Sequence, residues 1–381
     1  MTHTLRTASA AVVLAILVLV GSYGCGPGDS AKNKGNEVRI AANLPLTGDL
    51  AIGGASVRDG ALMALEEMRK SDGKPVTLNF DWQDNAGDPK LAVSIMQKQY
   101  LNPPDIYVSG VKPQTMAIAD QVRAKGTPHF VWIFDAFINK QSNNNFRTWV
   151  SYKVEPPIYL SYAQKMKPDR VAIVYVQLPH SVEEFETLVI PGLRSQGISK
   201  IYSEPFQYGK KDFKDVAVKV RNFKPDLIIL NAFPEEMVAL VRAFRPLGLI
   251  KDGNVICTYD MLDAGTILGA DESEGIRVVA PLFVSRPDSA RVRAFRASFE
   301  AKYKKEPLYT HAFGYDMALI IHDAAKRLML PANHTAWIEA LRATKIDGVT
   351  GPLTFDSDGD LITPQEVAVF RQGRPVPDES R

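Results

Sequence analysis

The chain has 381 residues, which is enough for two globular units with separate cores. Apolar residues make up 45% and charged residues 23%, values typical of a folded soluble protein, so disordered and fibrous classes are excluded. Lys and Arg number 45 against 43 Asp and Glu, so no global field attracts nucleic acid, and a DNA-binding role is not expected.

The N-terminal residues predict export. Arg6 precedes the apolar run 8–20, which as a helix spans about 20 Å and is shorter than the roughly 30 Å of a bilayer core. Residues 1–24 are therefore interpreted as a signal peptide ending before Cys25, which resembles the lipid-modified cysteine of a bacterial lipobox. Ser22 stands where that motif usually has Leu, so an unlipidated signal peptide is the alternative. Residues 25–36 are rich in Gly, Lys and Asn and are expected to form a flexible tether.

The next part of the chain alternates short apolar runs with segments of helical periodicity. The Asp88-Pro89 pair, a capping carboxylate followed by proline, marks the start of one helix. The expected strands are 38–43, 76–84, 106–109 and 129–133, and the expected helices are around 57–68, 89–99 and 114–125. This order predicts a mostly parallel sheet with helices on both faces.

A second series of the same kind begins after Trp149. Its expected strands are 170–176, 200–206, 226–232, 254–258 and 275–280, and its expected helices are 182–196, 213–221, 234–247, 288–304, 310–327 and 335–343. A β-hairpin is expected at the end, with strands 351–355 and 363–371 around the turn 356–360. Two such halves predict two lobes, with a ligand bound beyond the carboxyl ends of the strands.

Motifs for catalysis, nucleotides and metals are missing from the sequence. There is no glycine-rich phosphate loop, and the six histidines fit no metal pattern. Asp356, Asp358 and Asp360 are interpreted as a hairpin turn, because a calcium loop would need glycine at its sixth position and a later Glu. Cys257 lies among apolar residues and is expected to be a buried thiol. We therefore expect no cofactor, no metal and no catalysis.

Several strings between residues 37 and 372 together resemble one family, the periplasmic solute-binding proteins of branched-chain amino acid ABC transporters. The strings are PLTG at 45–48, MALEEM at 63–68, DNAGDPKLAV at 84–93, FRT at 146–148, RVAIVYV at 170–176, KPDLIILNAF at 224–233, YDMALI at 315–320 and IDGVTGPLTFDSDGD at 346–360. The resemblance implies an α/β fold of two doubly wound parallel-sheet lobes, joined by three crossovers near Trp149, Leu282 and Leu353.

On this basis the chain divides into a signal peptide, a tether, two discontinuous lobes and a tail. The expected ranges are 1–24 for the signal peptide, 25–36 for the tether, 37–149 and 282–353 for lobe 1, 150–281 and 354–374 for lobe 2, and 375–381 for the tail.

The resemblance also implies where the ligand is held. In lobe 1, Gln114 and Thr115 stand where hydroxyls and helix N–H groups usually bind an α-carboxylate. The next loop departs from the family pattern, because Trp132, Phe134 and Asp135 replace small hydroxyl residues. Gly53 stands where a large aromatic residue often projects, which leaves space. These changes favour an aromatic or larger apolar ligand.

In lobe 2 the resemblance implies that an acid binds the ligand's ammonium group and that an aromatic residue covers it. Asp260, with Tyr259 beside it, stands at the acid position; the alternative is a helix cap before Met261. His180 falls at the aromatic position, with a solvated loop histidine as its alternative. Phe233 either lines the lobe-2 wall or packs in the core.

The sequence thus predicts a monomeric, membrane-tethered periplasmic receptor. It is expected to capture a hydrophobic or aromatic amino acid, or a related small organic acid, and to deliver it to an ABC permease and ATPase complex. Two alternatives remain: a ligand-sensing module for a membrane receptor, and an exported α/β hydrolase, for which no nucleophile beside a base is found.

Overall fold

The computed structural model describes residues 35–48, 50–71, 76–133, 138–139, 142–150 and 152–379. From Gly35 onward the chain forms one compact unit. The predicted signal peptide, Cys25 and most of the tether lie outside the described residues. In the described ranges, every helix is too short or too polar to cross a bilayer.

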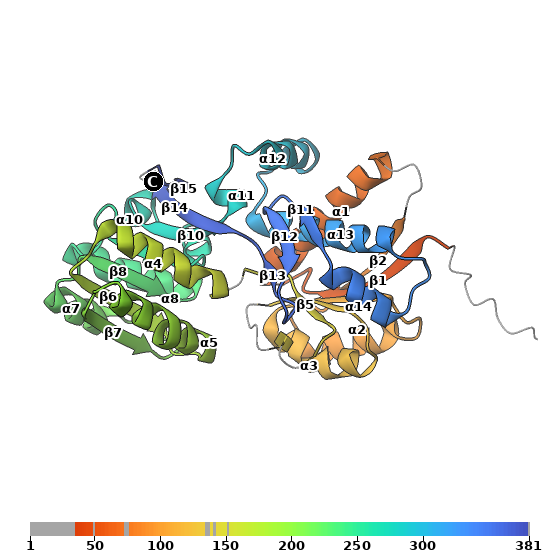
Figure 1. The fold of residues 1–381 in the computed structure, drawn as a ribbon, viewed down its shortest axis with the longest axis horizontal. Coiled ribbons are helices and arrows are strands. Elements are labelled where there is room, and N and C mark those ends of the chain that lie inside the picture. Colours follow the sequence, from red (N-terminus) through yellow and green to blue (C-terminus); the bar gives the residue numbers. More distant parts are fainter. Residues whose placement is uncertain are drawn as a thin grey trace, which may run out of the picture. The chain divides into compact units, whose positions relative to one another are not determined.

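The first sheet has five parallel strands in the order β2-β1-β3-β4-β5. They are β1 (Glu37–Leu44), β2 (Thr77–Asp84), β3 (Ile106–Gly110), β4 (His129–Trp132) and β5 (Asn145–Arg147). Ile40 and Val108 face α1 (Ala51–Ser71) and α13 (Tyr309–Arg327), whereas Ala41 and Tyr107 face α2 (Pro89–Gln99) and α3 (Lys112–Ala124). Helices therefore cover both faces of this sheet (Figure 1).

The capping prediction for α2 is confirmed. The Asp88 carboxylate accepts a hydrogen bond of 2.7 Å from the backbone N–H of Lys90, and Pro89 is the first helical residue.

The second sheet has seven strands in the order β15-β14-β10-β9-β8-β6-β7. The strands are β6 (Arg170–Val176), β7 (Lys200–Phe206), β8 (Leu227–Asn231), β9 (Val255–Cys257), β10 (Arg277–Pro281), β14 (Gln365–Arg371) and β15 (Arg374–Pro377). Those from β6 to β10 are parallel, and β14 and β15 are antiparallel. The bounds of β6 and β7 agree with the sequence prediction.

Helices also cover both faces of the second sheet. One face packs against α4 (Glu155–Met166), which the sequence analysis missed, and against α6 (Ile190–Ser195); the other packs against α7 (Lys214–Phe223) and α8 (Pro234–Phe244). The helix predicted at 182–196 is built from α5 (Pro179–Val182), a π-helical segment (Glu183–Val189) and α6. Three short helices, α9 (Met261–Ala264), α10 (Ala270–Ser273) and α11 (Leu282–Ser285), follow strands β9 and β10 in the chain.

The predicted terminal hairpin is wrong in its second strand. A small sheet is formed by β11 (Lys345–Asp347), β12 (Pro352–Phe355) and β13 (Leu361–Ile362), after α12 (Ala290–Tyr303), α13 and α14 (His334–Arg342). β12 pairs with β11 and β13, whereas β14 pairs with β10 and β15 of the second sheet. Pro364 lies between β13 and β14 and has no N–H to continue the ladder. Residues 375–377, expected to belong to a tail, are part of β15.

The chain passes between the two large sheets between β5 and α4, after Pro281, and at 363–364, about ten residues later than expected for the third passage. Buried Arg147 at the end of β5 forms an ion pair of 2.7 Å with buried Asp360, which precedes β13. Lys153 lies 3.1, 2.9 and 3.0 Å from carboxylate oxygens of Asp356, Asp358 and Asp360. The first passage is therefore tied to the segment that precedes the third.

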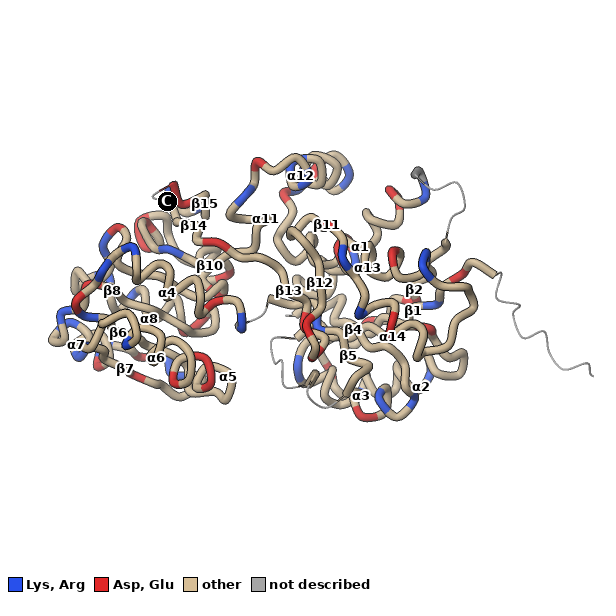
Figure 2. The backbone as a smooth tube through the Cα atoms, viewed as in Figure 1, with Lys and Arg blue, Asp and Glu red and all other residues tan. Residues whose placement is uncertain are grey.

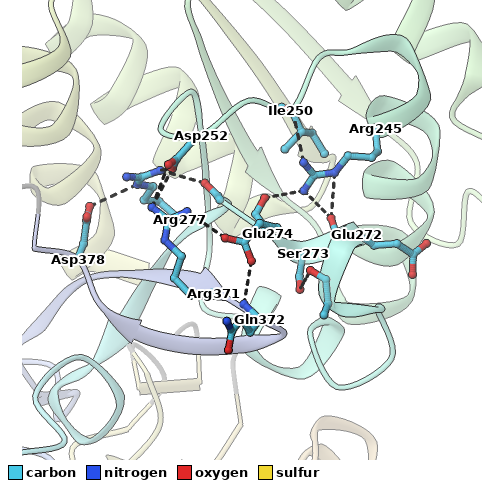
Figure 3. Close-up of polar contacts among 12 residues, drawn as sticks. Arg245, Ile250, Asp252, Glu272, Ser273, Glu274, Arg277, Arg371, Gln372 and Asp378 are labelled. Atoms are coloured by element: carbon cyan, nitrogen blue, oxygen red, sulfur yellow. Dashed lines mark hydrogen bonds and ion pairs between the residues drawn. The ribbon is translucent and has the colours of Figure 1, made fainter.

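Ion pairs also hold the β14–β15 hairpin on the second sheet (Figure 3). Arg371 on β14 bonds Asp252 at 2.9 Å and Glu274 at 3.2 Å, and Arg277 on β10 bonds Asp252 and Asp378. Elsewhere, Lys and Arg are interspersed with Asp and Glu along the chain (Figure 2), in keeping with the near-balanced net charge.

Candidate functional site

Most of the candidate residues follow the carboxyl ends of strands. In the first sheet, β1 lies between β2 and β3, so the strand order reverses beside it, and the residues after β3 and β4 lie at this reversal. In the second sheet the order reverses at β6, which lies between β7 and β8. Open α/β sheets bind ligands at such reversals, where loops diverge and helix N-termini point inward.

A strained residue joins β3 to α3. Val111, at the N-cap position of α3, has a φ of 64°, which is unusual for a β-branched side chain. Beneath it, the hydroxyls of Ser109 and Thr115 are 2.9 Å apart, and Ser109 is 2.8 Å from Nε2 of His129. Burial lowers the pKa of His129 to about 3, so its ring is neutral at pH 7. The Thr115 hydroxyl is thus hydrogen-bonded to the end of β3 and stabilises the loop that joins β3 to α3.

Gln114 occupies a different position on the same turn. Its amide NH₂ donates to the carbonyl of Gly87 in the loop after β2. Its Oε1 is buried and has no hydrogen-bond partner in the described part of the chain. Gln114 therefore offers a free acceptor at the first-sheet side of the site.

Trp132 fills the space expected beside Gly53. A Cβ on Gly53 would lie 3.0 Å from the indole ring of Trp132, so the space left by this glycine is occupied. The Trp132 ring packs edge-on against Trp149, with centroids 4.3 Å apart. Its indole N–H is buried and finds no acceptor among the described residues, so it remains available as a donor. Phe134 and Asp135, the other candidates on this loop, lie outside the described residues.

Trp149 is the centre of an aromatic cluster that the sequence analysis missed, having used this residue only as a boundary. We define the cluster as Trp132, Trp149, Tyr259, Tyr309 and Phe313. The ring centroids of Tyr259, Tyr309 and Phe313 lie 6.1, 6.0 and 6.1 Å from that of Trp149. The Trp149 indole N–H also donates to the Tyr259 hydroxyl at 3.0 Å. The cluster joins β4, the first passage, the loop after β9 and the start of α13.

Asp260 does not cap a helix. It occupies the N-cap position of α9 but makes no capping hydrogen bond; its side chain accepts one bond of 3.3 Å, from the hydroxyl of Thr258. Burial, together with nearby Glu155 and Asp263, raises the pKa of Asp260 well above the usual range. The capping alternative for this residue is therefore wrong.

Two further buried acids, Glu155 and Glu184, lie near Asp260. Glu155 begins α4 and accepts hydrogen bonds from the Tyr259 N–H at 3.4 Å and the Tyr159 hydroxyl at 3.2 Å. Glu184 lies in the π-helical segment, and neither of its oxygens has a hydrogen-bond partner among the described residues. Burial raises the pKa of Glu155 to about 8 and, with the charges of Glu155 and Asp260, raises that of Glu184. No sequence motif singled out either residue.

The described part of the chain gives these three carboxyl groups no cationic partner. Among the described residues, no Lys, Arg or His forms an ion pair with Glu155, Glu184 or Asp260. Buried carboxyl groups without a counter-ion favour either a bound proton or a bound cation. No group of His, Cys, Asp and Glu suited to a metal ion is found in the described ranges.

The other candidates of the second sheet, Phe233 and His180, come from other elements than these acids. Phe233 is half-buried, packs edge-on against Tyr208 with centroids 5.3 Å apart, and begins α8. His180 is half-buried in α5. The hydroxyl of Ser181, next to it, lies 3.1 Å from Oδ1 of Asn231 and so fixes α5 to the end of β8.

Comparison with known proteins gives a family match over most of the chain. The model of the periplasmic binding protein family matches residues 37–374. The leucine-, isoleucine-, valine-, threonine- and alanine-binding protein of Pseudomonas aeruginosa is 26% identical, with 85% of this chain and 87% of that protein covered. The Leu/Ile/Val-binding protein of Escherichia coli is 23% identical, with 85% and 88% covered.

Solved structures share the fold. A branched-chain amino acid transporter substrate-binding protein of Streptococcus pneumoniae, in complex with isoleucine, matches with a TM-score of 0.71 and 19% identity, covering 89% of this chain and 97% of that one. An ABC transporter solute-binding protein of Rhodopseudomonas palustris, in complex with benzoate, matches with a TM-score of 0.71 and 17% identity, covering 90% and 98%.

Proposed function

Because the chain belongs to the periplasmic binding protein family, of the branched-chain amino acid ABC transporter type, we propose that it binds an amino acid with an aromatic or large apolar side chain and delivers it to an ABC permease and ATPase complex. Like its relatives, it is a substrate-binding protein and not an enzyme. Its place outside the cytoplasm follows from the same family. The capture step needs no bond to be broken, only a change in the open–closed equilibrium of two lobes.

The proposed lobes are built on the two large sheets. The third passage at 363–364 supports placing 37–149 and 282–362 in lobe 1, and 150–281 and 363–377 in lobe 2. The site would then lie where the aromatic cluster, which includes Tyr259 from the loop after β9, meets Asp260. Hinge closure of two such lobes around a ligand is a common binding mechanism.

The observation that carries the proposed ligand class is the group of buried acids without a cation. An ammonium group at Asp260 would neutralise charge that the described residues leave unpaired, and a charge-assisted bond in a buried site is strong. The ligand carboxylate would meet the Trp132 indole N–H and the N-terminal N–H groups of α3. The aromatic cluster would enclose the side chain.

A small aromatic acid without an amine is the second candidate. The aromatic cluster offers a surface on which a ring can stack, and the relative from Rhodopseudomonas palustris was solved with benzoate. Such a ligand would leave the acids near Asp260 unneutralised, which is why we favour an amino acid.

A thermal-shift screen of the purified protein would decide between these classes. L-Phenylalanine and L-leucine would be compared with benzoate and 3-phenylpropanoate, which lack the amine. A ligand present at about 100 times its Kd should add about 2.7 kcal/mol to the stability of the protein. We expect Asp260→Asn to abolish the shift with the amino acids.

The matched control is Asp169→Asn. Asp169 is an exposed acid just before β6, at the opposite end of the second sheet from the proposed site. Its substitution should leave the shift intact. An amino-acid shift that survives in Asp260→Asn would reject the role of that carboxylate, and a response to the amine-free acids alone would favour the second candidate.

We propose further that Cys25 carries a lipid that tethers a monomer to the membrane. Metabolic labelling with a fatty acid should mark the wild-type protein and not Cys25→Ser; equal labelling of both would reject the anchor. A sensing role uses the same site, and uptake of the ligand by cells with and without the gene separates it from transport.

A further inference from the structure

We infer that Glu155 and Glu184 join Asp260 in a three-carboxyl subsite that releases a proton when the ammonium group of a ligand binds. The inference rests on the proposed function, because it specifies how the site recognises the charged group of the ligand. The released proton passes to the solvent, and the ligand keeps its own ammonium protons.

The three carboxyl groups are brought together from separate parts of the chain. Glu155 starts α4 after the first passage, Glu184 lies in the π-helical segment after β6, and Asp260 follows β9. The hydrogen bond from the Tyr259 N–H places the Glu155 carboxyl against the backbone next to Asp260. The charges of Glu155 and Asp260 both act on Glu184, and the charge of Glu155 acts on Asp260, so the three groups share one site.

The hydrogen bonding of Glu184 points to a missing partner. Its side chain is fully buried, and neither oxygen receives a hydrogen bond from a donor in the described part of the chain. A carboxylate has no proton of its own to donate, so two adjacent carboxylates cannot satisfy each other. A single proton held between Glu155 and Glu184 satisfies both, and so does a ligand cation placed between them.

The described surroundings of the three acids supply no positive charge. Titratable groups next to these acids, or next to those neighbours, are Tyr159 from α4, Cys257 from β9, Tyr259 from the loop after it, Asp263 from α9, and Tyr309 from α13, whose hydroxyl donates to Asp263 at 3.0 Å. All of them are neutral or negative at pH 7. His180, on the helix that precedes the π-helical segment, is a base whose titration the experiment has to separate from that of the pair.

The pair therefore holds a proton in the ligand-free protein at pH 7. Burial raises the pKa of Glu155 to about 8, and that of Glu184 is raised as well. An ammonium group in the subsite favours the ionised form of both acids and expels this proton. Because binding releases a proton, affinity must increase with pH while the pair is still protonated.

Isothermal titration calorimetry of L-phenylalanine and L-leucine between pH 6 and 9, in phosphate and in Tris, measures the proton directly. We expect release of up to about one proton, and an association constant that increases up to about tenfold per pH unit below pH 8 and levels off above it. Because burial alone raises the pKa of Glu155, both acids have to be replaced: Glu155→Gln combined with Glu184→Gln should remove the proton release and flatten the pH dependence. The control Glu300→Gln, an exposed acid on α12, should keep both.

Two results would overturn the inference while leaving the proposed function intact. One is an affinity for the amino acids that does not change with pH. The other is a pH dependence that the variant with both acids replaced retains, which would assign the proton to a group outside the pair. Absence of binding by either amino acid would instead refute the proposed function, and the coupling with it.

The proton on the pair is also tested without a ligand. Because the folded-state pKa of Glu155 lies above its usual value of 4.5, its contribution to stability is present at low pH and is lost as the pH rises toward 8. Urea unfolding of the ligand-free protein should therefore show a stability that falls between pH 6 and 9, and less so in Glu155→Gln. If Glu155→Gln does not fold, the variant with both acids replaced is used instead; an unchanged pH profile in the variant that folds would refute the shared proton.

Discussion

Replacing Gly314 by alanine should separate two helices that pack backbone to backbone. A Cβ at Gly314 of α13 would lie 2.1 Å from the carbonyl oxygen of Val57 and 2.6 Å from its Cα, both in α1. Carbon–oxygen contacts need about 3.3 Å, so the helices would have to move apart by about 1.2 Å. Gly60 of α1 is equally close to α13, since a Cβ there would lie 1.9 Å from the carbonyl oxygen of His311.

The expected cost follows from which atoms clash. A clash with a flexible side chain can relax, whereas Val57 presents backbone atoms that are fixed by the hydrogen bonds of α1. We therefore expect Gly314→Ala to lie at the upper end of the range for overpacking, a loss of about 3 kcal/mol of unfolding free energy. Tyr309, on the first turn of α13, belongs to the aromatic cluster, so ligand affinity should fall as well.

Urea unfolding followed by tryptophan fluorescence measures this loss. Gly269→Ala is the matched control, because a Cβ there would meet its nearest atom at 3.5 Å and the backbone has no positive φ. The control should change stability by less than about 1 kcal/mol. If Gly314→Ala were as stable as the control, the close approach of α1 and α13 would not be a constraint on the fold, and the reasoning would fail.

Three further predictions concern stability. Asp88→Ala removes the cap of α2, which bonds Lys90 at 2.7 Å, and should cost about 1 kcal/mol in chemical unfolding; a change near zero would mean that the bond is not formed in solution. Arg147→Met removes the 2.7 Å partner of buried Asp360, which keeps Lys153 at 3.0 Å, and should therefore cost about 3 kcal/mol, the lower end of the range for breaking a buried pair; a stability close to that of the wild type would contradict a buried pair. Burial lowers the pKa of His129 from 6.5 to about 3, so the stability that its neutral ring contributes is lost by about 1.4 kcal/mol per pH unit as the pH falls below 6.5. In acid unfolding, the stability of His129→Gln should therefore depend less steeply on pH, and an unchanged dependence would contradict a buried neutral ring.

The candidate site was predictable where a residue follows a strong strand. Tyr259 and Asp260 follow β9, and Gln114 lies in the first turn of the helix that follows β3; the apolar pattern identified both strands, so all three residues could be placed near the carboxyl ends of strands. Glu155, Glu184 and Trp149 were missed for a physical reason. A charged or aromatic side chain on a helix or a connection carries no local signal of burial, and these residues are buried or packed only because distant segments cover them.

The amino-acid sequence by itself determined the alternation of strands and helices, the cap of α2 at Asp88 and the repetition of one α/β pattern in two halves, because periodicity, caps and prolines act over a few neighbouring residues. The tertiary structure alone decided that β14 joins β10 instead of β12, that Trp132 fills the space at Gly53, and that three acids are buried together with no cation beside them in the described part of the chain. These outcomes depend on contacts between residues far apart in the chain, where packing and desolvation outweigh local preference.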